Sequence, residues 1–318
     1  MRKRSEVIFS SENKLKKMMK FEVVSFGSAV IDAFVDTEFN ERSNSFNYPA
    51  GSKILVNNLK FDIGGGATNT AVAFARLGLG TGCICKIGDD NNGQDILNML
   101  KNEKIKFLGS KIKGKTGYSI ILDSKDRSRT ILTFKGPGND VRLSEIPKFK
   151  TDWLYFSSVL GKSLRTQEKL VMKLKKEGTK LAFNPGEYLI KREDLTSMLK
   201  LCDVLILNKE EAEMLCKKYK KKGNLMVCLR ELGPKIIVIT DKNNLISCSD
   251  GNEDYFLKPN KVKVVERTGA GDAFASGFVA GMIVGKTIPE SLKLGLKESE
   301  SVIRYFGAKN KLLRMKLK

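Results

Sequence analysis

Residues 268–274, with the sequence TGAGDAF, have the residue types and spacing best suited to chemistry. Glycines allow the backbone to approach a ligand, and the unpaired N–H groups of a helix start favour an anion such as a transferring phosphoryl group. Asp272 follows in the first helical turn, where it is placed to accept a proton from an attacking hydroxyl. An anion cradle beside a base is what phosphoryl transfer to an alcohol requires. The alternative is a plain helix start with Asp272 as a capping carboxylate.

Residues 64–78, with the sequence GGGATNTAVAFARLG, form a second glycine run, which leads into an amphipathic helix ending at Gly78. The two segments lie some two hundred residues apart. In this order they resemble the paired signatures of the ribokinase-like (PfkB) sugar kinase family, and the resemblance extends from about residue 23 to about residue 308. The pair is far more specific than either segment alone, because short glycine motifs have many chance matches.

The resemblance implies that the segment around Asp272 holds the anion hole and the catalytic base. Asp272 would orient the acceptor hydroxyl and take up its proton as the bond to phosphorus forms. Gly269, Ala270 and Gly271 would donate backbone N–H groups to the developing charge. A carboxylate at a helix N-terminus tends to be ionised, so we expect Asp272 to be weakly basic.

The resemblance places the acceptor at the other glycine segment. Asn69 matches the family's sugar-binding asparagine, and Gly64 and Gly65 match glycines that let the substrate approach the backbone. Asp32 lies where the family has a sugar-binding aspartate, and a carboxylate there can accept two hydroxyl hydrogen bonds. The alternative for Asp32 is a turn or capping residue. Together with Asp272, these residues form the predicted acceptor site.

Asn208 and Glu211 resemble the family's N-x-x-E motif, which positions Mg²⁺ and phosphate through water. Their side chains offer the hard oxygen atoms that suit Mg²⁺, which typically keeps several waters. A helix N-cap at Asn208 is the alternative, and the two roles are compatible. The resemblance implies ATP and Mg²⁺ as cofactors and leaves a monovalent cation open as a third. The residues expected to contact the nucleotide are Asn208, Thr240, Gly269 and Gly271.

Two places depart from the family pattern. Family members commonly carry Asp-Thr before the Thr-Gly-Ala-Gly-Asp run, whereas this chain has Glu266 and Arg267. Arg267 is placed either to bind phosphate or a substrate group, or to form an ion pair with Glu266 or a neighbour. After Thr240 the family tends to have a glycine-rich turn, and here residues 241–244 are DKNN. Asparagine tolerates positive φ, so we expect the turn to survive.

One motif is rejected on its context. Residues 109–116, GSKIKGKT, satisfy the P-loop pattern G-x-x-x-x-G-K-[ST]. A P-loop needs a strand before it and a helix after it, because the helix start directs N–H groups at phosphate. Here a strand-like run, residues 118–122, follows. We expect Thr116 to turn the chain toward a hairpin, and Gly88-Asp89-Asp90, which matches a family turn, to be structural.

The fold class predicted from the pattern is α/β. Alternating βα units imply a parallel sheet covered by helices, with ligands beyond the carboxyl ends of the strands. The resemblance implies the ribokinase-like three-layer fold, with a central mostly parallel sheet flanked by helices and a small β lid. The expected strands are 22–27, 53–61, 81–87, 117–123, 129–134, 152–156, 180–183, 204–207 and 235–240, and the expected helices are 94–101, 164–177, 192–201, 209–217, 271–284 and 289–305.

Two segments fall outside the alternation, at about 36–62 and 116–134. We expect them to form the lid, which would exclude water from the cleft. Several family members pair their lids, so the resemblance leaves a homodimer through the lid open. Residues 19–318 are expected to form one kinase domain. Residues 1–18 are expected to be a disordered extension or a mis-called translation start.

Composition excludes several classes of protein. The chain has no histidine, which removes Ser-His-Asp and Cys-His catalysis and every histidine-containing metal site. No run approaches the roughly 18 apolar residues of a membrane span, and the basic N-terminus lacks the apolar stretch of a secretory signal. A cytoplasmic protein is expected, with free buried thiols rather than disulfides or zinc. The six cysteines are Cys83, Cys85, Cys202, Cys216, Cys228 and Cys248.

The predicted activity is ATP- and Mg²⁺-dependent phosphorylation of a hydroxyl, in particular a primary alcohol of a sugar. A nucleoside kinase on the same fold is the first alternative, and a non-catalytic sugar- or nucleotide-binding protein is the second. The net charge of +21 motivates a nucleic-acid binder as the third, but the lysines are scattered and no nucleic-acid motif accompanies them. A positive field also favours anionic ATP.

Overall fold

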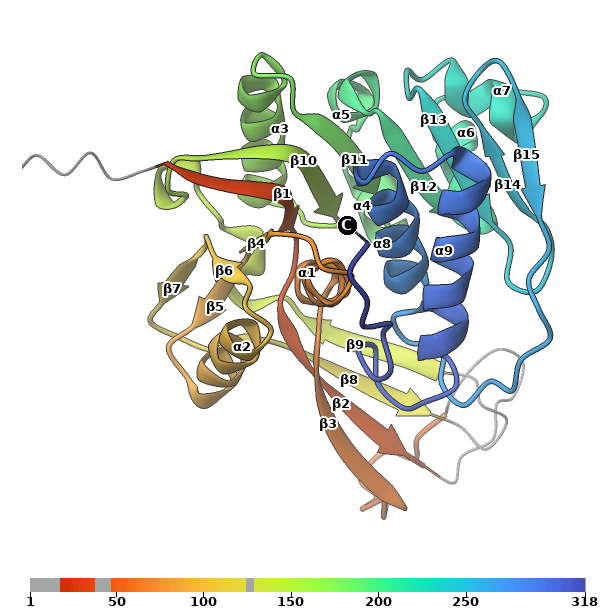
Figure 1. Ribbon diagram of the computed structural model, residues 1–318. Coiled ribbons are helices and arrows are strands. Elements are labelled where there is room, and N and C mark those ends of the chain that lie inside the picture. Colours follow the sequence, from red (N-terminus) through yellow and green to blue (C-terminus); the bar gives the residue numbers. More distant parts are fainter. Residues whose placement is uncertain (1–17, 38–46, 124–128, 318) are drawn as a thin grey trace, which may run out of the picture.

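The computed structural model describes residues 18–37, 47–123 and 129–317 (Figure 1). The expected N-terminal extension therefore lies outside the described residues, apart from Met18. The first strand begins at Met19, three residues earlier than expected.

The described residues form a nine-stranded central sheet in the order β15-β14-β13-β12-β11-β10-β1-β4-β6. Every neighbouring pair from β13 to β6 is parallel, and β14 and β15 extend one edge as antiparallel strands. The predicted mostly parallel sheet is thus confirmed. Its strands are β1 (Met19–Phe26), β4 (Thr81–Ile84), β6 (Lys106–Phe107), β10 (Phe149–Ser157), β11 (Lys180–Asn184), β12 (Val204–Asn208), β13 (Ile236–Thr240), β14 (Ile246–Ser249) and β15 (Asp254–Leu257).

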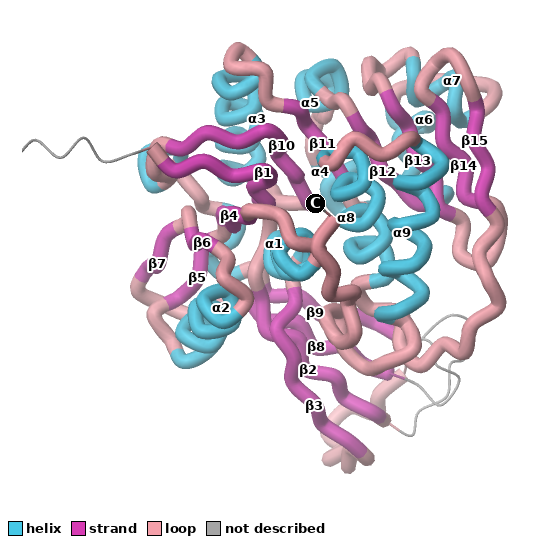
Figure 2. The backbone as a smooth tube through the Cα atoms, in the orientation of Figure 1, coloured by secondary structure: helices cyan, strands magenta, loops and turns pink. Residues whose placement is uncertain are grey.

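Helices cover both faces of this sheet. Strands such as β12 are therefore buried on both sides, as is typical of a parallel sheet. Leu205 and Leu207 of β12 pack into one core with the helices of one face, and Val204 and Ile206 pack into a second core on the other (Figures 1 and 2). The first face carries α3 (Gly161–Lys175), α4 (Glu187–Arg192), α5 (Thr196–Leu201), α6 (Lys209–Lys218) and α7 (Leu225–Arg230). The second carries α1 (Gly66–Arg76), α2 (Asn91–Asn102), α8 (Ala270–Ile283) and α9 (Ile288–Val302).

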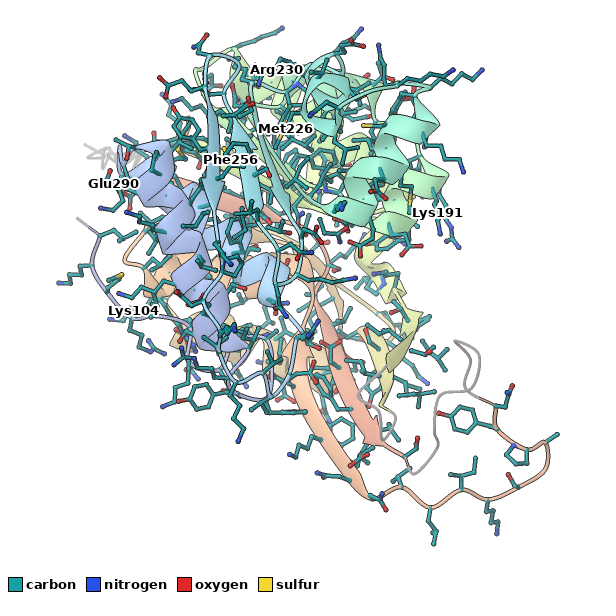
Figure 3. The ribbon with its side chains drawn as sticks, turned by 90° about the vertical axis from the view of Figure 1, so that its right-hand side faces the viewer. Lys104, Lys191, Met226, Arg230, Phe256 and Glu290 are labelled. Carbon is teal, nitrogen blue, oxygen red and sulfur yellow. The ribbon has the colours of Figure 1, made fainter. Side chains whose placement is uncertain are left out.

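A separate four-stranded sheet forms the lid, in the order β3-β2-β8-β9. In a view turned by 90° from that of Figure 1, the strands of this sheet extend beyond the body of the molecule (Figure 3). The predicted hairpin is confirmed, but the lid begins at residue 30 rather than 36, so Asp32 lies within a lid strand and not in a turn. The strands are β2 (Val30–Asp36), β3 (Asn58–Gly64), β8 (Gly117–Asp123) and β9 (Arg129–Phe134).

Some element boundaries differ from the prediction for local reasons. The expected strand 81–87 divides at Cys85 into β4 and β5 (Lys86–Gly88), because β5 leaves the central sheet to pair with β7 (Ser110–Ile112). The expected helix 192–201 begins later, as α5 at Thr196, and the turn before it is held by Asp194, which accepts from the backbone N–H and hydroxyl of Thr196. The short helix α4 that precedes it was not predicted. The strands β14 and β15 and the helix α7 were not predicted.

The P-loop interpretation is ruled out by the structure. Strand β8 follows Thr116 directly, and Thr116 donates from its backbone N–H and its hydroxyl to the Asp90 carboxylate, at 2.9 and 2.5 Å. Asp90 also caps α2 by accepting from the Gly93 N–H. Residues 109–116 and the turn at Gly88-Asp89-Asp90 therefore have structural roles.

The six cysteines are buried and free, as expected. Within the described ranges, no helix is long and apolar enough to cross a membrane.

Glu298 provides a pH-dependent stability prediction. The side chain is fully buried in α9, and one of its oxygens accepts from the Leu313 N–H while the other, Oε1, has no partner among the described residues. Burial raises its pKa to about 7. The folded chain therefore binds this proton more tightly than the unfolded chain, and the stabilisation present at low pH is lost as pH rises toward 7.

We expect Glu298→Gln to reduce the fall in unfolding free energy between pH 5 and pH 8 by roughly 1–3 kcal/mol. Urea unfolding at the two pH values measures it. The control is Glu300→Gln, on the same helix but bonded at the surface to Asn260. An equal fall in wild type and Glu298→Gln would contradict the prediction.

Candidate active site

Polar residues line the carboxyl edge of the central sheet. Ser157 and Asn184 are register partners at the ends of β10 and β11, and Asn208 and Thr240 are partners at the ends of β12 and β13. Because these strands are parallel and adjacent, their ends lie side by side. The predicted nucleotide residues Asn208 and Thr240 are thus brought together.

Asp272 lies in the first turn of α8, as predicted, and accepts a 2.8 Å hydrogen bond on Oδ2 from the Asn69 amide. Asn69 is in the first turn of α1. The two glycine-led helix starts therefore meet at their polar ends, although they lie 203 residues apart in the chain. Asp272 keeps part of its surface exposed, while Asn69 is only 6% exposed.

The glycine at the start of α8 is required by its surroundings. Gly269 has a left-handed φ of 79°, which favours glycine. A Cβ there would also lie 2.5 Å from the Cβ of Ala308, in the segment that follows α9. Gly271 has neither restriction, because a Cβ there would meet nothing within 4 Å. The segment predicted to form the anion hole is thus closely packed at Gly269 and open at Gly271.

The electrostatics of Asp272 differ from the sequence-based expectation. Burial raises its pKa, and the hydrogen bond from Asn69 and the charge of Lys309 oppose that effect. We predicted an ionised, weakly basic carboxylate from the helix start alone. Desolvation outweighs that influence here, so Asp272 is a stronger base than predicted.

Asp32 lies on lid strand β2 against the glycine segment. A Cβ at Gly64 would be 1.8 Å from Asp32 Oδ2, so glycine at this point leaves the space that the Asp32 carboxyl occupies. Burial raises the pKa of Asp32 to about 6, whereas a hydrogen bond from Ser119 and the charges of Lys309 and Lys135 lower it. Asp32 and Gly64 are thus adjacent, as predicted for an acceptor site.

Asn208 and Glu211 form a capping box. Glu211 N–H donates to Asn208 Oδ1 at 2.8 Å, and Asn208 N–H donates to Glu211 Oε2 at 2.9 Å. The predicted capping alternative is therefore present. Burial raises the pKa of Glu211 to about 7, and the charges of Glu210, Glu187 and Asp272 add to this.

The Glu211 side chain also fits a cation held through water. Its Oε1 has no hydrogen-bond partner among the described residues, and negative charge from other carboxylates acts on the same group. A nearby cation would relieve both the burial and the repulsion. Within the described ranges, no cluster of three metal-ligating side chains occurs.

The two departures from the family pattern have local structural explanations. The Glu266 carboxylate accepts from the backbone N–H groups of Arg267 and Thr268 and from the Thr268 hydroxyl, so it orders the turn before α8. Arg267 is exposed and makes no ion pair within the described part of the chain. In the turn after Thr240 the positive φ of 48° falls on Lys242 and not on an asparagine, contrary to prediction.

Three residues of the site were missed from the sequence. Lys309 reaches Asn69 from the segment after α9. Ser157 Oγ is buried beside Gly27 and Gly66 without a partner among the described residues. The third, Tyr155, is fully buried, and its pKa is raised by burial and by the charges of Asp272 and Glu211. Ser157 carries a usable signal, a polar residue at a strand end, whereas Lys309 resembles many other lysines.

A glycine-led helix start beside a carboxylate at the edge of a parallel sheet is an arrangement suited to phosphoryl transfer to an alcohol. Residues 20–314 match the family described as pfkB family carbohydrate kinase, and the chain belongs to that family. The family and the kinases among its relatives make this chain a phosphotransferase with an alcohol acceptor and ATP as co-substrate. The similar proteins include both sugar kinases and nucleoside kinases.

Individual relatives support the family without naming one substrate. An uncharacterized sugar kinase of Archaeoglobus fulgidus is 28% identical over 76% of this chain and 99% of that protein. An ATP-dependent 6-phosphofructokinase of Thermoanaerobacterium thermosaccharolyticum is 26% identical over 91% of this chain and 90% of that protein. The solved nucleoside kinase of Methanocaldococcus jannaschii, of the ribokinase family, has a TM-score of 0.79 at 19% identity, covering 93% and 96% of the two chains. The ribokinase-like fold is thereby confirmed.

Proposed function

We propose that this protein transfers the γ-phosphoryl group of ATP to a hydroxyl of a sugar, in particular a primary alcohol, with Asp272 as the base. The observation that carries the proposal is the 2.8 Å hydrogen bond between Asn69 and Asp272. It joins the predicted acceptor residue to the predicted base. The acceptor site comprises Asp32, Gly64, Gly65, Asn69 and Asp272.

Asp272 orients the acceptor hydroxyl and takes its proton as the oxygen bonds to the γ-phosphorus. The bond from that phosphorus to the bridging oxygen breaks, and ADP leaves with the electron pair. Gly269, Ala270 and Gly271 donate N–H groups to the charge on the transferring group. The raised pKa of Asp272 supports this role, because a stronger base accepts the proton more readily.

The nucleotide lies along the strand ends, contacted by Asn208 and Thr240 and by the turn at Gly269 and Gly271. Mg²⁺ bound beside the nucleotide would neutralise negative charge on its phosphates. Glu211 Oε1 and the Asn208 side chain would hold it through water. The uncommitted oxygen of Glu211 supports this assignment.

A nucleoside acceptor is the second candidate. The nucleoside kinase of Methanocaldococcus jannaschii shares the fold over nearly its whole length. Both candidates use the same base and anion hole, so they differ only in the acceptor.

The test is ADP release from Mg-ATP over a panel of ribose, fructose, sugar phosphates, glucose derivatives, adenosine, inosine and cytidine, with K⁺ and with Na⁺. Asp272→Ala is run alongside. Turnover of one sugar that is lost in the variant supports the sugar kinase, and turnover of a nucleoside alone replaces it with the second candidate. Turnover that persists in Asp272→Ala would reject the assigned site.

The lid also supports a homodimer. Ala33 is the register partner of both Phe61 and Ile120, and Ile120 is the partner of Leu132, so the three large side chains share one face of the lid sheet. Phe61 is 59% and Leu132 53% exposed. An exposed apolar face of this kind is typical of a protein–protein interface. In a two-fold dimer the same face of each subunit would bury that of the other.

We expect Leu132→Glu to convert a dimer into a monomer, because it places a charge in an apolar interface. Sedimentation velocity of both proteins measures this. Val227→Glu, at a 56% exposed valine on α7, is the matched control and should leave the dimer intact. A wild-type protein that is monomeric at all concentrations would reject the lid dimer.

A further inference from the structure

Lys309 is a buried lysine in the segment that follows α9, and only 7% of it is exposed. The segment passes under the lid: Phe306 packs against Phe34 of β2 with ring centroids 4.5 Å apart, and Lys60 of β3 lies over the same ring. Burial of an ammonium group is costly unless carboxylates or carbonyls surround it. The contacts of Lys309 therefore indicate what it does.

The Lys309 ammonium donates to Asn69 Oδ1 at 2.7 Å and also to the Ile63 carbonyl. Because Oδ1 of Asn69 accepts from the lysine, the other amide atom, Nδ2, must face Asp272, to which it donates at 2.8 Å. The three side chains thus form a chain of hydrogen bonds, Lys309 to Asn69 to Asp272. An amide turned the other way would lose both bonds.

Charge accompanies these bonds. Asp32, Asp62 and Asp272 all act on Lys309 electrostatically, and each favours its charged form against the effect of burial. Burial nevertheless lowers the pKa of Lys309, so its positive charge depends on these three carboxylates. Asp32 and Asp272 are in turn stabilised as carboxylates by Lys309.

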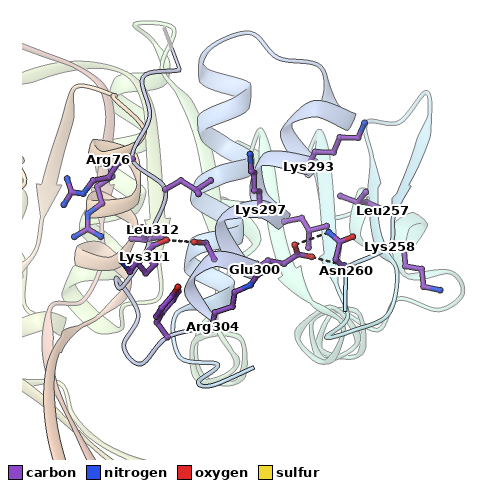
Figure 4. A pocket seen from close by; sticks show the side chains of 15 residues that line it. Arg76, Leu257, Lys258, Asn260, Lys293, Lys297, Glu300, Arg304, Lys311 and Leu312 are labelled. Atoms are coloured by element: carbon purple, nitrogen blue, oxygen red, sulfur yellow. Dashed lines mark hydrogen bonds between the residues drawn. The ribbon is translucent and has the colours of Figure 1, made fainter. Parts of the chain in front are cut away.

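The backbone of the segment is held in place on both sides of Lys309. Ala308 packs against Gly269, the residue that begins the anion-hole helix. The Arg76 guanidinium donates to the Lys309 carbonyl at 2.5 Å and is itself paired with Glu103. Lys311 lies instead in a basic groove of about 900 Å³ beside α9 (Figure 4), where its backbone carbonyl accepts from Ser301.

We propose that Lys309 is a positioning residue for phosphoryl transfer: it fixes the Asn69 amide so that Asn69 orients Asp272, and it supplies the positive charge that balances the base. The inference rests on the proposed role of Asp272 as base. It assigns to the segment after α9 a part in the reaction that neither glycine motif supplies.

The pH dependence of Asp272 separates this role from a structural one. Burial raises the pKa of Asp272, and among the described residues Lys309 is the cation that opposes it. The other titratable groups that act with Asp272 are Tyr155 of β10, Tyr188 of α4 and Glu211 of α6. None of these is a cation, so removal of the lysine charge should raise the pKa of Asp272 further.

We expect Lys309→Met to lower kcat at pH 7 by roughly 10- to 100-fold, because the base is neither oriented nor kept charged. In the pH dependence of kcat, the acid limb should move to higher pH. The difference in kcat between Lys309→Met and the wild type should therefore become smaller as pH rises. Lys309→Arg, which keeps the charge, should leave that limb near its wild-type position. Lys311→Met makes the same change at an exposed lysine two residues away and should behave as wild type.

A second measurement does not depend on the acceptor. Carbon-13 NMR of aspartate-labelled protein follows the Asp272 carboxyl, which is assigned by its disappearance in Asp272→Asn. The midpoint should move to higher pH in Lys309→Met and remain unchanged in Lys311→Met. Thermal unfolding verifies that each variant is folded, and Lys309→Gln replaces Lys309→Met if the latter is not.

Two failures are distinguishable. An Asp272→Asn variant that retains the wild-type rate would reject the base, and with it the proposed function. An inactive Asp272→Asn together with an unchanged Asp272 titration in Lys309→Met would overturn only the role of Lys309.

Discussion

We expect replacement of Asp272 by asparagine to lower kcat by roughly 10²- to 10⁴-fold, the loss typical of removing a general base. Asparagine has nearly the same shape, and its side-chain oxygen can still accept from the Asn69 amide, so the start of α8 should remain folded. What is lost is the proton acceptor. Binding of ATP should change little, because the backbone N–H groups of the anion hole are retained.

Steady-state ADP release with the best acceptor of the panel measures this loss, and calorimetry with Mg-ATP measures binding. Asp95→Asn, at an exposed position on α2, is the control. Its rate should equal that of the wild type. A rate in Asp272→Asn within a few-fold of wild type would remove Asp272 from the reaction and leave the capping role as its explanation.

The second large effect concerns the two glycines of the anion hole. Gly271→Ala should lower kcat by about 100-fold, because a methyl group at the open start of α8 displaces the phosphoryl group from the N–H donors by the order of 1 Å. It should not destabilise the fold. Alanine in a helix is favoured over glycine by roughly 0.5–1 kcal/mol, so the free energy of unfolding should be equal or slightly higher.

Gly269→Ala is the matched variant, with the opposite expectation for stability. Its left-handed φ and the 2.5 Å approach of the new Cβ to Ala308 should lower the free energy of unfolding by about 2–4 kcal/mol. Urea unfolding and kcat are measured for both variants. Equal stability losses in the two would contradict the geometry, and full activity in Gly271→Ala would place the phosphoryl group elsewhere.

Much of the fold was predictable because local signals agreed with the tertiary arrangement. The apolar run at residues 204–207 and the helical pattern after it are both confirmed as β12 and α6. Predictions were wrong where pairing partners decide the element. No local signal shows that Lys86 and its neighbours leave the central sheet for β7, or that residues 30–36 join the lid.

The candidate site was predictable in the residues of its two helix starts but not in the groups that surround them. Asn69 and Asp272 were identified from glycine-led helix starts, and the structure places them in contact. The partners that tune them come from elsewhere in the chain. Lys309 is one of 57 lysine and arginine residues, and nothing in its local sequence distinguishes it.

The sequence by itself determined the family, the alternation of strands and helices, and the positions that we propose for the base and the anion hole. Each of these depends on residues close together in the chain, since a glycine run and a helix start make a phosphate site locally. The tertiary structure alone decided that Asp32 is a lid residue, that burial raises the pKa of Asp272, and that Lys309 bonds the Asn69 amide beside it. Burial and Coulomb interactions are set by groups from distant segments, and spacing along the chain does not record them.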